Sequence, residues 1–322
     1  MSKTLLITGG TGSFGKAVLE KYVNDKYFSK IIIFSRDESK QDELKNYYSN
    51  KNNIKFIIGD IRDKESVFTA FKGVDYIFHA AALKQVPSCE FATMEAIKTN
   101  ILGSYNVISE AIKAKVGNLT LLSTDKSVYP INSMGLTKAL MEKLAINTEI
   151  NEKTRINCVR YGNVIFARGS FIPVFINQIL KKKEITLTDL NMTRFMMKME
   201  DAIDLVNKAI KSKQNRKIFV MKAPAAKIKD VGLALMNLLN RKINFKVTGI
   251  RPGEKIHECL VNKDEMYRSN FYKKYFIINK ENMRVNNKIL LEDYTSNTEK
   301  HLNINQICNL LKSLPEIKSI LL

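Results

Sequence analysis

Short apolar runs alternate with amphipathic segments over the first half of this chain. The runs lack polar alternation, which is typical of strands buried on both faces of a parallel sheet. Apolar residues at helical spacing separate them, as expected for helices packed on such a sheet. The predicted strands cover 3–8, 30–34, 54–58, 74–79, 119–123 and 157–160, and the clearest helices 16–23, 95–113 and 134–148. This order predicts an α/β fold with a Rossmann-type, doubly wound parallel sheet, because right-handed crossovers place helices on both faces.

The alternation becomes irregular beyond about residue 165. There the pattern predicts helices at 170–180, 201–211, 229–239 and 304–311, short strands at 185–188 and 218–222, and a charged, irregular stretch at 262–300. We therefore predict a Rossmann-type domain over 1–165, to which segments near 193–222 return. Residues 166–192 and 223–322 are expected to form most of a smaller, discontinuous substrate-binding lobe.

A glycine-rich turn joins the first predicted strand to the first helix. Gly9, Gly12 and Gly15 follow the G-x-x-G-x-x-G form of the dinucleotide fingerprint. Such glycines permit a tight turn, close approach of the backbone to a diphosphate, and tight packing of helix on strand. The helix N-terminus then faces the phosphates. We expect the whole turn, including Thr11, Ser13 and Phe14, to bind a dinucleotide.

The ends of the next strands supply the rest of the predicted cofactor site. Ser35, Arg36 and Lys40 favour NADP, because an Arg at this position accommodates the extra phosphate, whereas Asp37 keeps NAD open. His79 is expected to be a core residue that closes a buried strand rather than a base. We further place these residues beside the cofactor: Asp60, Ile61, Ala80, Lys84, Thr99, Asn100, Met134 and Val164.

The strongest candidate chemistry follows the fifth strand. Thr124, Asp125 and Lys126 come directly after it, and Lys138 lies on the first turns of the next helix. An adjacent carboxyl and amine can serve as an acid and a base if their surroundings move the two pKa values in opposite directions. Lys126 then needs a lowered pKa to be neutral, and Asp125 needs a raised pKa to stay protonated.

Composition narrows the class of protein. The 322 residues are 45% hydrophobic and carry a formal net charge of +20. Lysine runs such as 181–183 are short and lack interleaved aromatics, so we expect a lysine-rich solvated surface and no nucleic-acid partner. Four scattered cysteines without a CxxC pair indicate free thiols in a reducing compartment, and no metal site. Without a signal peptide or an apolar stretch of roughly 20 residues, we expect a cytoplasmic protein without membrane insertion.

Motifs along nearly the whole chain carry a family resemblance. They are TGGTGSFG at 8–15, FSRDE at 34–38, HAAALKQVP at 79–87, LSTDK at 122–126, RYGN at 160–163, MTRF at 192–195 and RPGEK at 251–255. Together they resemble the extended short-chain dehydrogenase/reductases. More narrowly, they are similar to the inverting 4,6-dehydratases of UDP-N-acetylglucosamine, including the branch that serves capsular polysaccharide biosynthesis.

The resemblance implies a three-step cycle on a UDP-N-acetylhexosamine. A hydride passes from C4 of the sugar to the nicotinamide, water leaves across C5 and C6, and the hydride returns to C6. Lys126 is implied as the base at C5 and Asp125 as the acid at C6. Thr124 is placed near the C4 oxygen, and Lys138 at the nicotinamide ribose. Loss of the C5 proton also permits inversion at C5, and the resemblance suggests it.

One residue departs from the usual pattern of the superfamily. Met134 stands four residues before Lys138, where a tyrosine base is usual, although the capsule branch shares this methionine. Tyr129 is too far from Lys138 along the helix to replace it. The substrate contacts inferred by position are Lys84, Asn163, Arg168, Arg194, Arg251 and Glu254. Relatives also suggest a homo-oligomer, often a hexamer.

Two other functions stay open. A UDP-sugar 4-epimerase shares nearly the same first half and needs no elimination; the Asp125–Lys126 pair favours the dehydratase, while Met134 disfavours a standard epimerase. A sensor that binds NADP without catalysis is the third reading, and the retained Lys138 and Asp–Lys pair argue against it.

Overall fold

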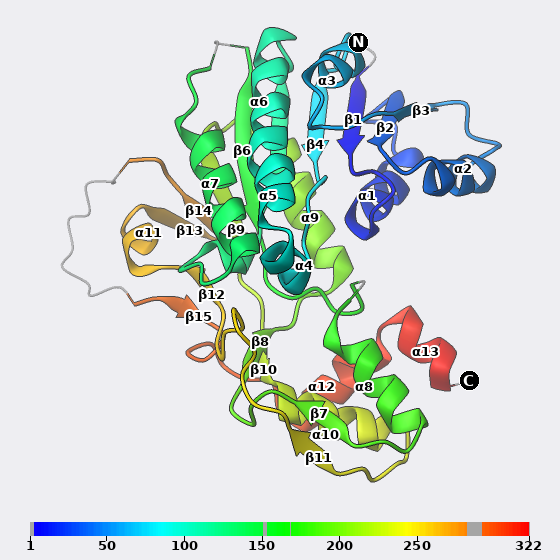
Figure 1. The fold of residues 1–322 in the computed structure, drawn as a ribbon, viewed down its shortest axis with the longest axis vertical. Helices are drawn as coiled ribbons and strands as arrows, with labels where there is room; N and C mark the ends of the chain where they lie inside the picture. The colour runs from blue at the N-terminus through cyan, green and yellow to red at the C-terminus, as the bar shows by residue number, and fades with distance from the viewer. Residues whose placement is uncertain (1–2, 151–152, 168, 282–291, 322) are drawn as a thin grey trace.

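The core of the protein is a large, mostly parallel sheet. A computed structural model describes residues 3–150, 153–167, 169–281 and 292–321, and within them the main sheet has nine strands in the order β13-β14-β9-β6-β5-β4-β1-β2-β3 (Figure 1). Every pairing from β3 to β9 is parallel. These strands are β1 (Thr4–Thr8), β2 (Lys30–Ser35), β3 (Ile54–Ile58), β4 (Tyr76–His79), β5 (Asn118–Leu122), β6 (Arg155–Arg160) and β9 (Lys217–Met221). The predicted doubly wound fold is confirmed.

Helices cover both faces of this sheet, as its doubly buried strands require. On one face α1 (Ser13–Val23) packs beside α9 (Met199–Ile210), while α3 (Lys64–Ala70), α6 (Ser104–Lys113) and α7 (Ser133–Asn147) adjoin on the other. Short polar side chains begin several helices by accepting a first-turn amide hydrogen bond. Asp37 caps α2 (Glu38–Tyr47) in this way, Asp63 caps α3, and Asn132 caps α7.

The long helix expected over 95–113 is interrupted. Its first part is α5 (Thr93–Ala96), which follows the short α4 (Val86–Phe91), and a π-helical segment, η1 (Ile97–Gly103), then leads into α6. Asn100 in this segment is fully buried. Its side-chain oxygen accepts from the Leu83 amide at 2.8 Å, and its amide group donates to the Leu83 carbonyl at 2.9 Å and to Thr137 at 3.0 Å. The wider turn thus brings a polar side chain into contact with the loop after β4.

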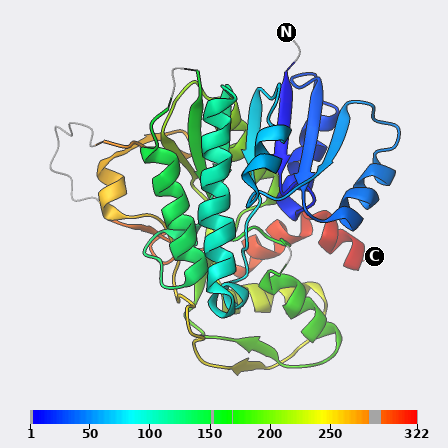
Figure 2. The same cartoon turned by 45° about the horizontal axis from the view of Figure 1, so that its top comes forward.

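A second, smaller hydrophobic cluster lies below the carboxyl ends of the parallel strands in Figure 1. It is built mainly from α8 (Phe171–Leu180), β7 (Ile185–Leu187), α10 (Ile228–Leu238), α12 (Ile304–Lys312) and α13 (Pro315–Leu321). β11 (Phe245–Val247) pairs with β7, and β10 (Ala225–Lys227) pairs with β8 (Thr193–Phe195). Figure 2 shows this lobe under the sheet from a second direction.

The stretch expected to be irregular, 262–300, contains ordered elements. After β12 (Cys259–Val261) come α11 (Lys263–Tyr267) and the hairpin of β13 (Ser269–Tyr272) and β14 (Tyr275–Ile278). β14 pairs antiparallel with β9, so this hairpin extends the main sheet rather than the smaller lobe. Later β15 (Tyr294–Thr295) pairs with β12. Our expectation was wrong for the described part of this stretch, because the two uncharged strands have only four residues each and are joined by a tight turn, Lys273 and Lys274, without a glycine. Residues 282–291 lie outside the described residues.

Candidate functional site

A cavity of about 620 Å³ opens where the parallel strands end. Its walls are the loops that follow β1, β2, β3, β4, β5 and β6, as expected for ligand sites in open α/β sheets. Most of the residues predicted for the cofactor surround this one cavity. They are Gly9, Thr11, Gly12, Ser13, Phe14, Gly15, Ser35, Arg36, Lys40, Asp60, Ile61, Ala80, Lys84, Thr99, Met134, Lys138 and Val164. Their individual roles stay predictions.

The glycine-rich turn fits a diphosphate group. Gly12 begins α1 without a side-chain cap, and the first turn of α1 carries no acidic residue, so its amides face the cavity. A helix N-terminus without a side-chain cap or a nearby carboxylate favours an anion. A Cβ atom at Gly15 would lie 2.5 Å from the Gly9 carbonyl oxygen, so only glycine allows the turn and helix to pack this closely. A dinucleotide would therefore be held by Gly12, Ser13, Phe14 and Gly15.

Side chains after β2 and β3 form the part of the cavity predicted for the adenosine end. The Asp37 carboxylate accepts the Lys40 amide as the cap of α2 and forms an ion pair with the Lys40 ammonium. Arg36 lies 3.5 Å from Asp60 with its side chain half-exposed. Arg36, Asp37 and Lys40 all line the cavity, and both cations already contact a carboxylate of the protein.

His79, predicted as a core residue, and Asn100, predicted as a cofactor residue, both lie behind the cavity wall. His79 is buried between the hydroxyls of Thr8, 2.7 Å from Nδ1, and Ser104, 3.0 Å from Nε2, and burial lowers its pKa to about 3. This confirms it as a neutral core residue. Asn100 does not line the cavity; its hydrogen bonds hold Leu83, which does. We therefore correct our expectation for Asn100: it supports the loop after β4 rather than lining the cavity.

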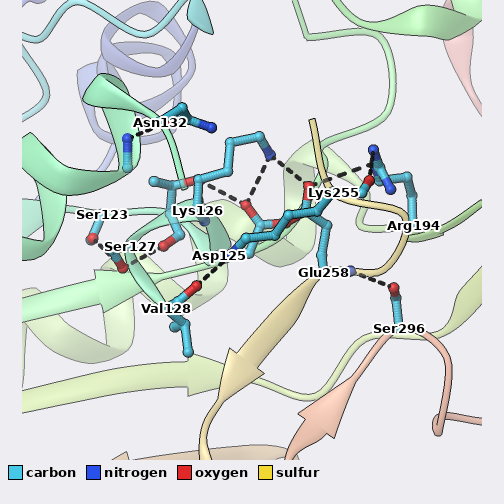
Figure 3. Close-up of polar contacts among 12 residues, drawn as sticks. Ser123, Asp125, Lys126, Ser127, Val128, Asn132, Arg194, Lys255, Glu258 and Ser296 are labelled. Carbon is cyan, nitrogen blue, oxygen red and sulfur yellow. Dashed lines mark hydrogen bonds and ion pairs between the residues drawn. The ribbon is translucent and has the colours of Figure 1, made fainter. Parts of the chain in front are cut away.

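The turn after β5 places the candidate acid and base against the cavity. Thr124 begins η2, a single 3₁₀ turn (Asp125–Ser127), and α7 packs on that turn. The approach is close because Gly135 has no side chain; a Cβ there would lie 2.3 Å from the Lys126 carbonyl oxygen. Asp125 Oδ1 accepts from the Thr124 hydroxyl at 2.9 Å and from Lys126 Nζ at 3.1 Å (Figure 3). Thr124 and Lys126 line the cavity, whereas Asp125 is fully buried behind them.

Burial shifts the two pKa values differently from our expectation. It raises the pKa of Asp125 above its usual range, against the opposing effect of Lys126, as the acid role requires. Burial alone would lower the pKa of Lys126, but the carboxylates of Asp125 and Glu258 outweigh it, so that pKa lies above its ordinary value. The expected fall of the Lys126 pKa is thus wrong for the protein without substrate. Lys126 lies between the carboxyl groups of Asp125, at 3.1 Å, and Glu258, at 3.4 Å.

Lys138 has the lowered pKa instead. Its side chain is buried at the cavity wall with Nζ 3.0 Å from Met141 Sδ, and burial lowers its pKa to about 8. Met134, in the place of the usual tyrosine, is buried at the same wall and packs in a small cluster with Cys89 and Ala96. At the place of the usual tyrosine, the wall therefore holds a thioether beside an amine with a lowered pKa.

The predicted substrate residues are only partly gathered at the cavity. Lys84 and Asn163 line it, and the buried Asn163 Oδ1 has no hydrogen-bond partner among the described residues. Arg194 is buried elsewhere and donates to the carbonyls of Thr193, Lys255 and Ile256. Outside the cavity lining, Glu254 accepts from Thr188 at 3.1 Å and Arg251 is exposed. Arg168 lies outside the described residues. The expected direct contacts of Arg194, Arg251 and Glu254 do not appear in this cavity.

Tyr161 and Glu258 are among the site residues that were missed from the sequence. Tyr161 lines the cavity, and its ring stacks on Phe14 with centroids 4.7 Å apart. Its place in the RYGN motif was the available signal. Glu258 lies 3.4 Å from Lys126, yet 132 residues separate them, and only its closeness to the RPGEK motif gave any hint.

Comparison with known proteins agrees with this architecture. The family described as "Polysaccharide biosynthesis protein" matches residues 5–280. A protein of Rickettsia bellii named UDP-glucose 4-epimerase is 48% identical and is covered over 98% of its length by 99% of this chain. The structure of Pen from Bacillus thuringiensis has a TM-score of 0.89 at 34% identity, with coverage of 97% of this chain and 99% of Pen.

A more distant structure shares the fold alone. DesIV from Streptomyces venezuelae, a dTDP-glucose 4,6-dehydratase solved with NAD and TYD, gives a TM-score of 0.70 at 19% identity over 79% of this chain and 86% of DesIV.

Over the described residues, no helix combines the length and apolar character that crossing a lipid bilayer demands. The match over most of the chain and the near full-length relatives lead to one conclusion: the chain belongs to the polysaccharide biosynthesis protein family.

Proposed function

We propose that this protein is an NADP-dependent UDP-N-acetylglucosamine 4,6-dehydratase that inverts C5. The supporting observation is the buried Asp125–Lys126 pair at the cavity wall. An epimerase needs only hydride transfer and rotation of the sugar, whereas elimination also needs a base for C5 and an acid for C6. A hydrogen-bonded amine and carboxyl supply both from one pair of residues.

Proton transfer within this pair supplies both reagents at once. If the Lys126 ammonium gives its proton to Asp125 across their 3.1 Å hydrogen bond, the result is a neutral amine and a carboxylic acid. Lys126 then takes the C5 proton, and the Asp125 proton goes to the departing C6 hydroxyl, which leaves as water. Thr124, which bonds to Asp125 and lines the cavity, can pass that proton on. The pair returns to the ion pair of the resting state, so protons balance.

The cofactor supplies one part of the chemistry: when bound, the nicotinamide reversibly accepts a hydride. We propose NADP because Arg36 and Lys40 face the adenosine end while Asp37 is engaged as a helix cap. Lys138 would hold the nicotinamide ribose from the wall that also carries Met134. The cytoplasmic location and the homo-oligomer stay predictions.

The second candidate is a UDP-sugar 4-epimerase, and a specific observation favours it. The Rickettsia bellii relative, 48% identical over nearly its whole length, carries the name UDP-glucose 4-epimerase. This reaction would use the same cavity but leave Lys126 without a proton to take from C5.

One incubation separates the candidates. Purified protein is mixed with UDP-N-acetylglucosamine or UDP-glucose and NADP, and the products are followed by mass spectrometry and proton NMR. Loss of one water with a new methyl signal supports dehydration. An unchanged mass with an altered C4 configuration supports epimerisation and refutes the first proposal. Bound NADP with no product from any UDP-sugar would support the sensor.

Replacing Lys126 with alanine tests the base directly. We expect Lys126→Ala to abolish exchange of the C5 proton with solvent deuterium while NADP affinity changes little, because the role proposed for Lys126 is on the sugar and not on the cofactor. Lys113→Ala removes an exposed lysine that pairs with Glu110 on α6 and serves as the matched control. Exchange at the parent rate in Lys126→Ala would show that another group is the base.

A further inference from the structure

A buried carboxylate from the far end of the chain contacts the proposed base. Glu258 directly precedes β12, and its side chain is only 2% exposed. Its Oε1 lies 3.4 Å from Lys126 Nζ and 3.7 Å from Arg194 Nε (Figure 3). The other oxygen, Oε2, is buried and has no hydrogen-bond partner among the described residues. A charge with one unused oxygen in such a setting is costly unless its neighbours compensate.

The backbone of Glu258 is fixed as tightly as its side chain. Its amide donates to Ser296 Oγ at 2.9 Å, and the Ser296 amide donates to the Glu258 carbonyl at 2.8 Å. Arg194 is held in turn, because its terminal nitrogens donate to the carbonyls of Thr193, Lys255 and Ile256. Only the Nε side of this guanidinium is directed to Glu258. The carboxylate therefore lies between one fixed cation and one cation at the cavity wall.

Ionisable groups from four segments lie around the Glu258 carboxylate and the Lys126 ammonium. Asp125 and Lys126 come from η2, Arg194 from β8, and Lys255 from the loop before β12, while Tyr161 at the end of β6 faces Asp125. Burial would raise the pKa of Glu258, but Lys126, Arg194 and Lys255 together hold it below its usual range. Glu258 thus stays ionised while Asp125, its neighbour across Lys126, has a raised pKa.

Elimination would form a positive charge on Lys126, beside the carboxylate of Glu258. When Lys126 is neutral and Asp125 protonated, Glu258 is the remaining ionised carboxylate in ion-pair contact with Lys126 within the described part of the chain. As Lys126 gains the C5 proton, it becomes an ammonium at a wall where its side chain is 23% exposed. A fixed anion at 3.4 Å stabilises that charge as it forms, as the buried carboxylate of a serine-protease triad does for its imidazolium.

We propose that Glu258 is a positioning residue for the elimination: it orients the Lys126 amine toward the cavity and stabilises the positive charge that Lys126 gains. The proposal rests on the proposed function, in which Lys126 takes the C5 proton. Arg194 has the supporting role of keeping Glu258 ionised and in place. This role accounts for the burial, outside the cavity, of an arginine predicted to contact substrate.

The test is Glu258→Gln, which keeps the shape of the side chain and removes its charge. We expect kcat for dehydration to fall about 10- to 100-fold with KM within about threefold, since a supporting charge of the base is lost. The acidic limb of the pH–rate profile should move to lower pH by about one unit, because Lys126 loses a nearby anion. Glu258→Asp, which retains charge with a shorter reach, should restore the position of the limb more than the rate.

A matched control separates charge from folding. Glu299 also lies in the C-terminal part of the chain, and its carboxylate pairs with Lys222 at 3.2 Å. Glu299→Gln removes that charge and should leave kcat and the acidic limb of the pH–rate profile unchanged. Thermal unfolding and NADPH binding are measured for every variant. If Glu258→Gln leaves kcat within about twofold of the parent, or lowers it without moving the acidic limb, the proposal is overturned.

A second readout does not need turnover. The pH dependence with which an amine-selective acylating reagent modifies Lys126 is followed by peptide mass spectrometry, since only the neutral amine reacts. Glu258→Gln should shift this labelling to lower pH, and an unshifted profile would contradict the proposal. If the parent protein makes no dehydrated product but Glu258→Gln still shifts the labelling to lower pH, the proposed function alone is refuted.

Discussion

Replacing Arg160 with leucine should destabilise the protein strongly, because Arg160 is a fully buried cation shared by two buried carboxylates. From β6 it donates to Glu142 on α7 at 3.0 and 2.5 Å and to Glu265 on α11 at 2.8 Å from each terminal nitrogen. It also donates to the Leu260 carbonyl at 2.9 Å. The guanidinium thus joins the sheet, the helix that carries Lys138, and the C-terminal segment.

The expected magnitude follows from what the substitution leaves behind. Leucine would leave two largely buried carboxylates without their cation and a carbonyl oxygen without its donor, while one hydrogen bond to each carboxylate, from Ser127 and from Asn262, would remain. Removing one partner of a buried ion pair costs about 3–5 kcal/mol, and here one cation serves two anions, so we expect at least that loss. Such a loss is a large part of the total stability of a protein, typically about 5–15 kcal/mol.

Chemical denaturation followed by circular dichroism provides the measurement. Arg62→Leu is the control, because Arg62 also bonds to two carboxylates, Asp60 and Glu95, but at the surface, where ion pairs contribute little. The Arg160 cation holds the pKa of Glu265 below its usual range, against the effect of burial. That stabilisation is present at neutral pH and is lost as pH falls through the folded pKa, so the difference between parent and variant should shrink in acid.

A replacement of the whole cluster completes the test. Arg160→Met combined with Glu142→Leu and Glu265→Leu should recover much of the lost stability, because apolar residues of similar volume often replace a buried ion cluster without loss. A loss below about 1 kcal/mol in Arg160→Leu at neutral pH would show that water reaches the carboxylates, and our account of this cluster would be wrong.

Three further predictions concern the cofactor end of the cavity. Gly15→Ala should weaken dinucleotide binding at least about tenfold in a fluorescence titration with NADPH, because its Cβ would lie 2.5 Å from the backbone of Gly9 and Gly10; unchanged affinity would contradict this packing. Arg36→Ala should reduce the preference for NADP over NAD about tenfold, measured as the ratio of the two Kd values, and an unchanged ratio would remove Arg36 from the discrimination. Lys138→Met should abolish activity yet raise the free energy of unfolding at pH 7 by up to about 3 kcal/mol, because burial lowers the pKa of Lys138 to about 8. This gain should diminish as pH rises from about 8 toward the pKa of lysine in the unfolded chain, which denaturation at several pH values would show.

The parallel sheet was predictable from sequence because its strands are buried on both faces. Continuous apolar runs such as 5–7 and 31–34 indicate strands of a covered sheet when amphipathic helices separate them. The hairpin of β13 and β14 was missed for the opposite reason. It lies at an edge, and its tight turn places Lys273 at a φ of +57° without the glycine that usually marks such turns.

The site was predictable where one motif builds it and unpredictable where distant segments meet. Gly9 to Gly15 and Thr124 to Lys126 are local motifs, and each lies beside the cavity as its spacing indicated. The pKa of Lys126 was misjudged because Glu258 approaches from a strand far along the chain. No local pattern gives the sign of a shift that depends on such a tertiary contact.

The path of the chain between the two hydrophobic clusters limits how this protein can be altered. After α8 and β7 in the smaller cluster, the backbone returns to the sheet as α9 and β9, leaves again as α10 and β11, returns as β14, and ends in α12 and α13. Recombination at a single junction therefore cannot exchange the smaller cluster of one homologue for that of another. A chimaera would need several coordinated crossovers, so this part of the protein should change by point substitution rather than by replacement.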